Sequence, residues 1–173
     1  MSAPRTPAVS KTSFTTWPSA IAHLLDGDLT EPRLAEKLAF TVALITVDAA
    51  SRPITTLLGV GEMLVTGPGE MRLAIWAGSR AATQIGRDGR ATLTFVHDGS
   101  FYQVHLRVDA DAVSPDWPGL IFYSARIDAA EAQAVTYARL LSGITFELPA
   151  PQEVLPRWKA QLEVLRNQHF SKK

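Results

Sequence analysis

The sequence predicts a mainly β (α+β) protein, a small closed or split barrel with helices packed outside it. Two observations lead to this class. Apolar segments rich in β-branched residues follow one another as five or six strands from Phe40 onward, which is the pattern of a meandering sheet. One short helical segment interrupts the series near its middle, and helical segments flank it, which favours a curled sheet with peripheral helices.

The composition is that of an ordinary globular domain. Of the 173 residues 46% are hydrophobic and 20% are charged, and 17 basic residues balance 17 acidic ones. A chain without net charge gives no reason to expect nucleic acid or a membrane surface as a partner. There is no cysteine, no charged-then-apolar signal sequence, and no apolar run long enough to span a bilayer. We therefore expect a cytoplasmic protein that contacts neither nucleic acid nor membrane.

The N-terminal part is expected to hold a tail and two short helices. Residues 1–15 are rich in Ser, Thr, Pro and Ala and show no periodicity, which predicts a mobile tail. The remaining chain, 16–173, would form a single domain. Residues 17–25 look helical, with a proline in the first turn, and residues 30–38 predict a second short helix.

The barrel strands are read from runs of apolar and β-branched residues. The six expected strands are residues 40–47, 54–65, 72–76, 90–96, 101–113 and 120–127. Gly59 and Gly61 lie inside the second of them, where a glycine often marks a bulge, a bend or a close approach to a ligand. Asp98-Gly99 is a strong hairpin signal between the fourth and fifth strands.

The C-terminal part predicts two further helices. Residues 129–141 are expected to be helical, and residues 143–148 to form one more short strand. Residues 155–166 are amphipathic, with apolar side chains on one face of a helix. No internal repeat and no domain linker are visible in the chain.

The most informative stretch is the strand–helix–strand unit at 71–95. Its first strand passes directly into a helix through Gly78-Ser79-Arg80. The N-terminus of such a helix has free backbone N–H groups and the positive end of the helix dipole, so it suits an anion such as phosphate. Ser79 is a good N-cap and Gly89 a good stop. Arg80 falls in the first turn, where the dipole disfavours a cation unless an anion is bound. The local pattern alone leaves two readings open, a phosphate site and an ordinary capped turn.

Other candidate groups give weaker signals. Five arginines and only two acids lie between Arg72 and Arg107, so the middle of the chain is locally basic. The four histidines show no metal-like spacing, and no metal site is expected. His105 alternates with Gln103 and Arg107 on one face of a strand, which fits a wet surface or a pocket wall. No nucleophile elbow, Walker loop or Rossmann fingerprint is present, and no catalytic residue is identified.

These residues resemble the flavin-binding split barrel of the pyridoxamine 5′-phosphate oxidase-like proteins. The resemblance rests on Arg52-Pro53 entering a strand and on the strand–Gly78-Ser79-Arg80–helix–strand unit. It covers roughly Phe40 to Val113 and runs without gaps from Met71 to Gln103. It implies a six-stranded split β-barrel with peripheral helices, a homodimer, and FMN bound at the subunit interface.

The resemblance also implies a set of cofactor-binding residues. They are Thr56, Leu57, Ala74, Ile75, Ser79, Arg80 and Gln103. Gln103 lies outside the local turn motif, and the equivalent glutamine of the family contacts the flavin ring system. A capped turn needs Ser79, but no turn needs a glutamine on the fifth strand. Gln103 therefore ties the turn to the family's binding site.

Three cationic positions of the family carry other residues in this chain. The family's phosphate-binding arginine corresponds to Thr56, the lysine after the Ser-Arg pair to Ala81, and a lysine near the flavin ring to Gly61. A charge-assisted contact is worth about 1.5–3 kcal/mol, so several losses would weaken FMN binding by orders of magnitude. From Ser114 onward the chain does not match the oxidase's substrate-binding C-terminus. Oxidation of pyridoxamine phosphate itself is therefore not supported.

Three hypotheses follow for the function. The leading one is an FMN-binding protein, a flavin-dependent oxidoreductase of an unidentified small molecule, in which the cofactor carries the electron chemistry. The first alternative is a non-catalytic binding module for another cofactor, a deazaflavin or haem. The second is a structural homodimer without a cofactor. The retained Arg80 and Gln103 favour the first hypothesis, and the missing cations favour the alternatives.

Overall fold

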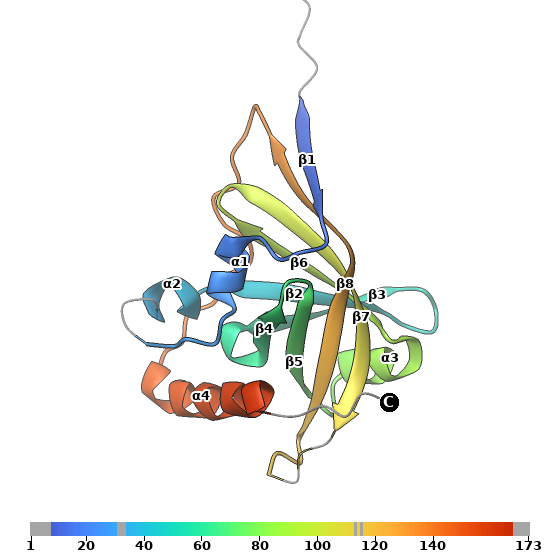
Figure 1. Cartoon of the computed structure of the whole chain (residues 1–173), viewed down its shortest axis with the longest axis vertical. Coiled ribbons are helices and arrows are strands. Elements are labelled where there is room, and N and C mark those ends of the chain that lie inside the picture. Colours follow the sequence, from blue (N-terminus) through green and yellow to red (C-terminus); the bar gives the residue numbers. More distant parts are fainter. Residues whose placement is uncertain (1–7, 31–33, 113, 115, 168–173) are drawn as a thin grey trace, which may run out of the picture.

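A computed structural model of the chain describes residues 8–30, 34–112, 114 and 116–167, and its main feature is one antiparallel sheet (Figure 1). In this described part the sheet has eight strands, in the order β3-β2-β6-β7-β8-β5-β4, with β1 paired to β8. The strands are β1 (Val9–Phe14), β2 (Thr41–Val47), β3 (Pro53–Gly59), β4 (Met63–Gly67), β5 (Glu70–Trp76), β6 (Arg90–His97), β7 (Ser100–Ala112) and β8 (Leu120–Val135).

The connection between β3 and β4 shows why the sheet curls. These two strands stand at opposite ends of the strand order, and a flat sheet would separate them by six strand spacings, about 29 Å. In the chain they are joined only by the 3₁₀ helix η1 (Val60–Glu62), which spans roughly 14 Å even when extended. The sheet must therefore bend round until its edges approach each other. The expected class, a mainly β split barrel with peripheral helices, is confirmed.

The strand count differs from the six expected, for two reasons. The predicted strand 54–65 is wrong as one element, because β3 ends at Gly59 and η1 turns the chain before β4 begins. The glycines thus mark a bend, which is one of the roles expected of them. The other additional strand is β1, which pairs with β8 from Val9↔Val135 to Phe14↔Ala130. The expected tail is wrong for these residues, and residues 1–7 lie outside the described part.

β8 is the element that departs most from the sequence prediction. The helix expected at 129–141 is wrong, since β8 continues to Val135 and no helix follows before α4. Its alanines, glutamate and glutamine have a helical preference, but β7 pairs with one edge of this segment and β1 with the other. Hydrogen bonding on both edges outweighs the local propensity. In place of the strand expected at 143–148, an isolated bridge joins Phe40 and Thr145.

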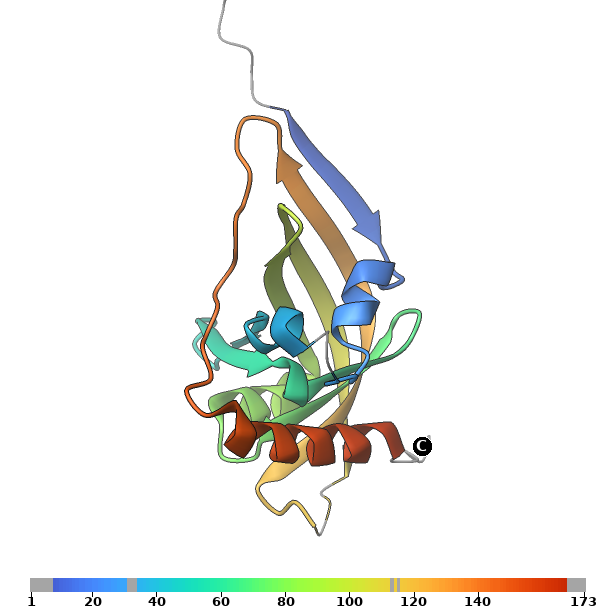
Figure 2. The same ribbon diagram turned by 90° about the vertical axis from the view of Figure 1, so that its left-hand side faces the viewer.

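In the described part of the chain, four α-helices pack around the barrel. They are α1 (Ser19–Leu24), α2 (Leu34–Leu38), α3 (Arg80–Asp88) and α4 (Pro151–Asn167). α1 lies within the expected range 17–25, and residues 31–33 of the second expected helix lie outside the described part. α3 and α4 lie toward one end of the sheet, whereas β6, β7, β8 and β1 form an arm at the other end (Figures 1 and 2). Figure 2 shows the long loop that returns from the tip of β8 to α4.

The core lies between the inner face of the sheet and these helices. The sheet contributes fully buried Leu44, Leu73, Leu93, Val104 and Phe122. α3 adds Ala81, Ala82 and Ile85, and α4 adds Trp158, Leu162 and Leu165. In the described part of the chain, no helix is long and apolar enough to cross a membrane.

Candidate functional site

The junction between β5 and α3 has the geometry of a capped helix start. Ser79 adopts an extended conformation, and its hydroxyl accepts a hydrogen bond from the N–H of Ala82 at 3.1 Å. Gly89, with a φ of 61°, ends the helix in the left-handed conformation. Arg80 is exposed, and its side chain has no hydrogen bond or ion pair with the described residues. An exposed arginine without a partner among the described residues therefore stands in the first turn of a nine-residue helix.

Ala74 and Ile75 lie on β5 just before this junction, and both side chains are buried. β8 pairs with β5 as far as Trp76, but β4 pairs with it only as far as Leu73. One backbone edge of β5 beyond Leu73 thus has no strand partner among the described residues. Any contact of Ala74 or Ile75 with a ligand would come from this backbone edge.

Leu57 and Gln103 lie on the same, outer face of the sheet. The register aligns Leu57 with Ala43, Ala43 with Thr94, and Thr94 with Gln103. Directly opposed residues of an antiparallel sheet share a face, so these four residues form a transverse row about 14 Å long. Leu57 is 48% exposed and Gln103 is half-buried. Leu57 forms the apolar end of this row and Gln103 its amide end, and a ligand or a partner could contact both.

Thr56 lies on the opposite face from Leu57. It is aligned with Leu44, and Leu44 is aligned with Leu93, both of which are fully buried. Thr56 is half-buried beside them. The structure therefore separates two neighbours that the sequence placed in one binding set, with Leu57 turned outward and Thr56 turned toward the core.

Packing explains two of the three positions at which this chain lacks a cation of the family that its sequence resembles. Ala81 is fully buried on the inner side of α3. A Cβ atom at Gly61 would lie 2.0 Å from Cγ of Trp158, which leaves no space for a side chain. Thr56 turns toward the apolar core row. A long charged side chain at Ala81 or Gly61 would have to displace core residues.

Trp158 is a residue that sequence reasoning did not connect with this region. Its indole lies against the backbone of β3 and η1, where Cβ atoms at Gly59 and Gly61 would lie 2.9 and 2.0 Å from ring atoms. Gln161, one helical turn further along α4, donates a hydrogen bond to the carbonyl of Gly61 at 3.0 Å. Two glycines in an otherwise β-branched run were the only sequence signal of this close approach.

A short hydrogen-bonded chain continues the outer face beyond Gln103. The amide of Gln103 is 3.1 Å from Nε2 of His105, and Nδ1 of His105 is 2.9 Å from the hydroxyl of Thr92. On the same strand as His105, Arg107 pairs with Asp128 at 2.9 Å. The guanidinium of Arg107 lowers the pKa of Asp128 below its ordinary 3.8. Both ring nitrogens of His105 thus have hydrogen-bond partners, which hold the imidazole in place on the polar outer face of the sheet.

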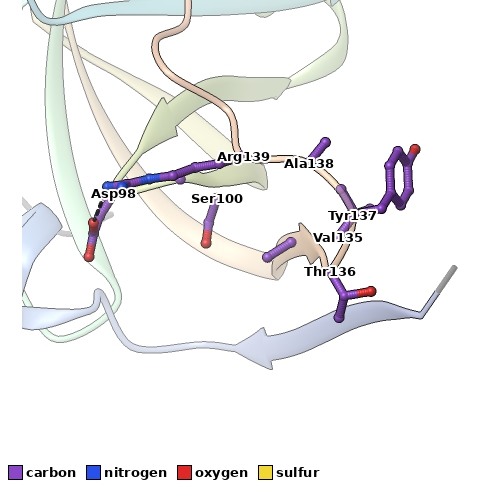
Figure 3. Close-up of a pocket in the computed structure, with 9 residues that line it drawn as sticks. Asp98, Ser100, Val135, Thr136, Tyr137, Ala138 and Arg139 are labelled. Atoms are coloured by element: carbon purple, nitrogen blue, oxygen red, sulfur yellow. Dashed lines mark ion pairs between the residues drawn. The ribbon is translucent and has the colours of Figure 1, made fainter.

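Two clefts of about 550 Å³ each lie away from the seven predicted residues. The first is at the tip of the arm, where Asp98 and Arg139 form an ion pair at 3.8 Å and Tyr137 turns outward (Figure 3). The second lies between β2 and β6 and includes Thr92 and His105. The described residues contain no group of three or more histidine or acidic side chains that could hold a metal ion.

Comparison with solved structures finds similar folds at low identity. A candidate pyridoxamine 5′-phosphate oxidase from Lactobacillus delbrueckii is 19% identical, with a TM-score of 0.46 over 60% of this chain and 93% of its own. An FMN-binding protein from Syntrophomonas wolfei is 13% identical, with a TM-score of 0.46 over 64% and 86%. The styrene monooxygenase flavin reductase from Pseudomonas putida S12 is 10% identical, with a TM-score of 0.44 over 57% and 85%. Matches at this level say nothing about the ligand of the present chain.

Sequence comparison gives a nearer relative. No model of a protein family matches the chain. The uncharacterized protein YclD from Bacillus subtilis (strain 168) is 31% identical over 148 residues, which are 83% of this chain and 92% of YclD. The chain belongs to the same protein family as YclD.

Proposed function

We propose that this protein binds FMN, with the phosphate at the N-terminus of α3 and the flavin ring against the outer face of the sheet, and that it acts as a flavin-dependent oxidoreductase. The observation that carries the proposal is the exposed, unpaired Arg80 beside the open start of α3. Without an anion, the helix dipole makes this position unfavourable for a cation. A bound phosphate would be attracted both by the positive end of the helix dipole and by the guanidinium of Arg80.

The donors around the helix start fit a phosphate. The backbone N–H groups of Arg80 and Ala81 lie in the first turn, where an α-helix leaves its N–H groups without intrahelical acceptors. The hydroxyl of Ser79 accepts from Ala82 and can still donate its own hydrogen. Arg80 adds the one side-chain cation. This donor set can hold a phosphate, but with fewer charges than the related family uses.

The outer face offers a surface for a flat, amphipathic ring. Leu57 gives an exposed apolar contact on this face. The amide of Gln103 can both donate and accept hydrogen bonds, as the polar edge of a flavin requires. The unpaired backbone edge at Ala74 and Ile75 supplies further donors and acceptors. When bound, FMN would supply the electron transfer, and the protein would supply position and hydrogen bonds.

A homodimer with the cofactor at the interface is part of the proposal. Leu57 and Val47, both more than 40% exposed, lie on the outer face of β3 and β2. A second copy of the chain would remove this apolar surface from water. Size-exclusion chromatography with light scattering tests the dimer by itself, and a monomer at micromolar concentration would contradict the interface site.

The test of the cofactor uses two ligands that differ only in the phosphate. The purified protein is freed of any bound chromophore and titrated with FMN and with riboflavin, followed by flavin fluorescence. We expect tighter binding of FMN, and we expect Arg80→Ala to weaken FMN by about 10- to 100-fold while leaving riboflavin unchanged. Arg126→Ala is the matched control, because Arg126 is an exposed arginine of β8 aligned with Glu70 at the far end of β5.

Other results would point to the alternatives. The buried positions of Ala81 and Gly61 favour a ligand that needs fewer cations than FMN. A visible spectrum of the protein as purified separates a flavin from a deazaflavin or haem. Equal affinity for FMN and riboflavin would contradict the phosphate site. A colourless protein that binds neither would contradict flavin binding altogether and favour a structural homodimer.

A further inference from the structure

The loop from β8 to α4 exposes several large apolar side chains in one short segment. Tyr137 is 72% exposed, Leu140 41%, Leu141 92% and Ile144 53%. These are four of the eight large apolar side chains that the described residues expose, and they lie within eight positions of the chain. A single exposed apolar side chain is ordinary, whereas a concentration of them marks a candidate interaction site. We call these four residues the arm surface, because the loop begins at the tip of the arm.

The loop that carries the arm surface is fixed to the rest of the molecule. Near its start, Arg139 reaches back to the turn between β6 and β7 and pairs there with Asp98 (Figure 3). Farther along, Thr145 forms a bridge with Phe40, and Phe146 packs against the core. The backbone is thus anchored on both sides of the exposed side chains. The arm surface is a built feature of the fold and does not arise from a loose loop.

The charges beside the arm surface favour a second copy of the chain as its partner. Arg139 and Asp98 form an ion pair at 3.8 Å, and their side chains are 76% and 84% exposed. An ion pair this open can exchange partners. When two copies are related by a two-fold axis, Arg139 of each copy can meet Asp98 of the other. A surface that offers both charges beside apolar groups is therefore complementary to itself.

A membrane surface suits this loop less well than a second copy does. Segments that bind at the lipid interface combine apolar side chains with several lysines or arginines. Residues 136–150 contain one basic residue, Arg139, and one acidic residue, Glu147. Because the loop has no net positive charge, anionic lipid would not attract it. A second copy carries the same balanced charge and the same apolar side chains.

We propose that two copies of the chain pack their arm surfaces against each other about a two-fold axis, with Arg139 of each copy paired with Asp98 of the other. Burial of the apolar side chains drives the association, and the exchanged ion pairs set the orientation of the two copies. The proposed flavin dimer uses a different surface, that of Leu57 and Val47, so the inference does not require flavin binding. Two such two-fold interfaces, used together, would assemble four copies.

The test is the mass of the full chain and of its variants in solution, measured by analytical ultracentrifugation at micromolar concentration. Leu141→Asp places a charge within the arm surface, and we expect it to halve the mass of the assembly. Because Leu141 is 92% exposed, this substitution should leave the urea unfolding of the chain nearly unchanged. Leu141→Met keeps an apolar side chain of similar size and should keep the native mass.

Leu57→Asp separates this interface from that of the proposed flavin dimer. If both interfaces exist, the native chain is a tetramer, and Leu57→Asp and Leu141→Asp each give a dimer. If the flavin interface does not exist, the native chain is a dimer, Leu57→Asp keeps that mass, and Leu141→Asp gives a monomer. Either pattern supports the arm interface, and only the first supports the flavin dimer.

Mixing two charge variants tests the exchanged ion pair. At a two-fold interface Arg139→Glu brings acids together and Asp98→Lys brings bases together, so each variant alone should associate about 3- to 10-fold more weakly than the native chain. In an equimolar mixture, one copy of each variant can form two pairs of opposite charge, and association should recover. Asp98 has a φ of 44°, so a lysine there also strains the turn, but this strain persists in the mixture and cannot cause a recovery.

Three results would overturn the proposal. They are a native chain that is a monomer at micromolar concentration, a Leu141→Asp variant that keeps the native mass, and a mixture of charge variants that associates no better than each variant alone. Sedimentation with phosphatidylglycerol vesicles checks the other possible partner. If Leu141→Asp abolished binding to these vesicles without changing the mass of the assembly, the arm surface would be a membrane contact and the proposal would be wrong.

Discussion

The helices α3 and α4 meet the same end of the barrel in different ways. α4 lies along it, with the indole of Trp158 against the backbone at Gly59 and Gly61. α3 approaches through its N-terminus, which β5 delivers through the capped turn at Ser79. Its first side chain, Arg80, is exposed. One helix therefore closes the barrel by packing, whereas the other leaves a polar helix start open.

This difference accounts for the pattern of charge in the proposed flavin site. Ala81 and Gly61 stand at two cationic positions of the family that the sequence resembles, and both are buried, Ala81 on the inner side of α3 and Gly61 against Trp158 of α4. Burying an unpaired charge is far costlier than burying an apolar group of similar size. The cation that remains, Arg80, is the one that stands outside both packing surfaces. Packing thus decides where charge survives in this site.

Gly61→Ala tests the closed side and should have the largest effect. The new Cβ would overlap the indole of Trp158 at 2.0 Å, and overpacking a core costs about 1–3 kcal/mol or more. We expect the free energy of unfolding, measured with urea, to fall by about 3 kcal/mol. Gly86→Ala is the matched control in α3, because a Cβ there meets nothing within 4 Å. It should raise the free energy of unfolding by about 0.5–1 kcal/mol.

Adding Trp158→Ala shows whether the indole causes the loss. Alone, this substitution should cost about 3–5 kcal/mol, because it leaves a cavity in the core. In the double variant Gly61→Ala/Trp158→Ala the steric conflict is absent. The loss of unfolding free energy in this variant should therefore be smaller than the sum of the losses in the two single variants. Fully additive losses would mean that Gly61 is required for another reason, and the contrast between the two helices would lose its basis.

The parts of the fold that sequence predicted well are those fixed by local signals. The unit at 71–95 is an example: a serine cap, a glycine stop and β-branched flanks each act within a few residues, and β5, α3 and β6 follow them closely. The helix predicted for residues 129–135 was wrong because the secondary structure of this segment depends on β1 and β7, which are distant in the chain. Local propensity could not reveal hydrogen bonding on both edges.

The candidate site shows the same division. Ser79 as a cap could be predicted from the turn alone. The strand alternation of Thr56 and Leu57 was readable, but which of them faces the core depends on the pairing of β3 with β2. Trp158 reaches Gly61 from nearly 100 positions away along the chain, so tertiary packing decides its role.

Ser79→Ala tests the open side and should have a smaller effect than Gly61→Ala. The hydroxyl of Ser79 accepts one hydrogen bond from the helix, from the N–H of Ala82. Losing such a cap costs about 1 kcal/mol. Ser79→Gly should cost only a few tenths of a kcal/mol, since glycine is tolerated at an N-cap. Urea unfolding of the two variants checks the order, and a loss as large as that of Gly61→Ala would show that α3 is also held tightly at its start.

A substitution of Glu62, on the side of the barrel that α4 covers, should have the smallest effect on stability. Its carboxylate accepts a hydrogen bond from the N–H of Gly59 at 2.7 Å, which lowers its pKa, but burial outweighs this and raises the pKa above its ordinary 4.5. A carboxyl whose pKa is higher in the folded state disfavours folding once it is ionised. The stability that Glu62 contributes is therefore largest below the unfolded pKa and falls as pH rises through the folded one.

Glu62→Gln separates this contribution from that of every other group. Glutamine keeps an oxygen that can accept from Gly59 but cannot ionise. We expect the free energy of unfolding of the native protein, measured relative to Glu62→Gln by urea titration, to decrease as pH is raised from below 4.5 and to level off above the raised pKa. Parallel pH profiles would show that Glu62 is as well solvated in the folded chain as in the unfolded one. The closed side of the barrel would then be open to water at η1, and the packing of α4 could no longer explain why charge is missing there.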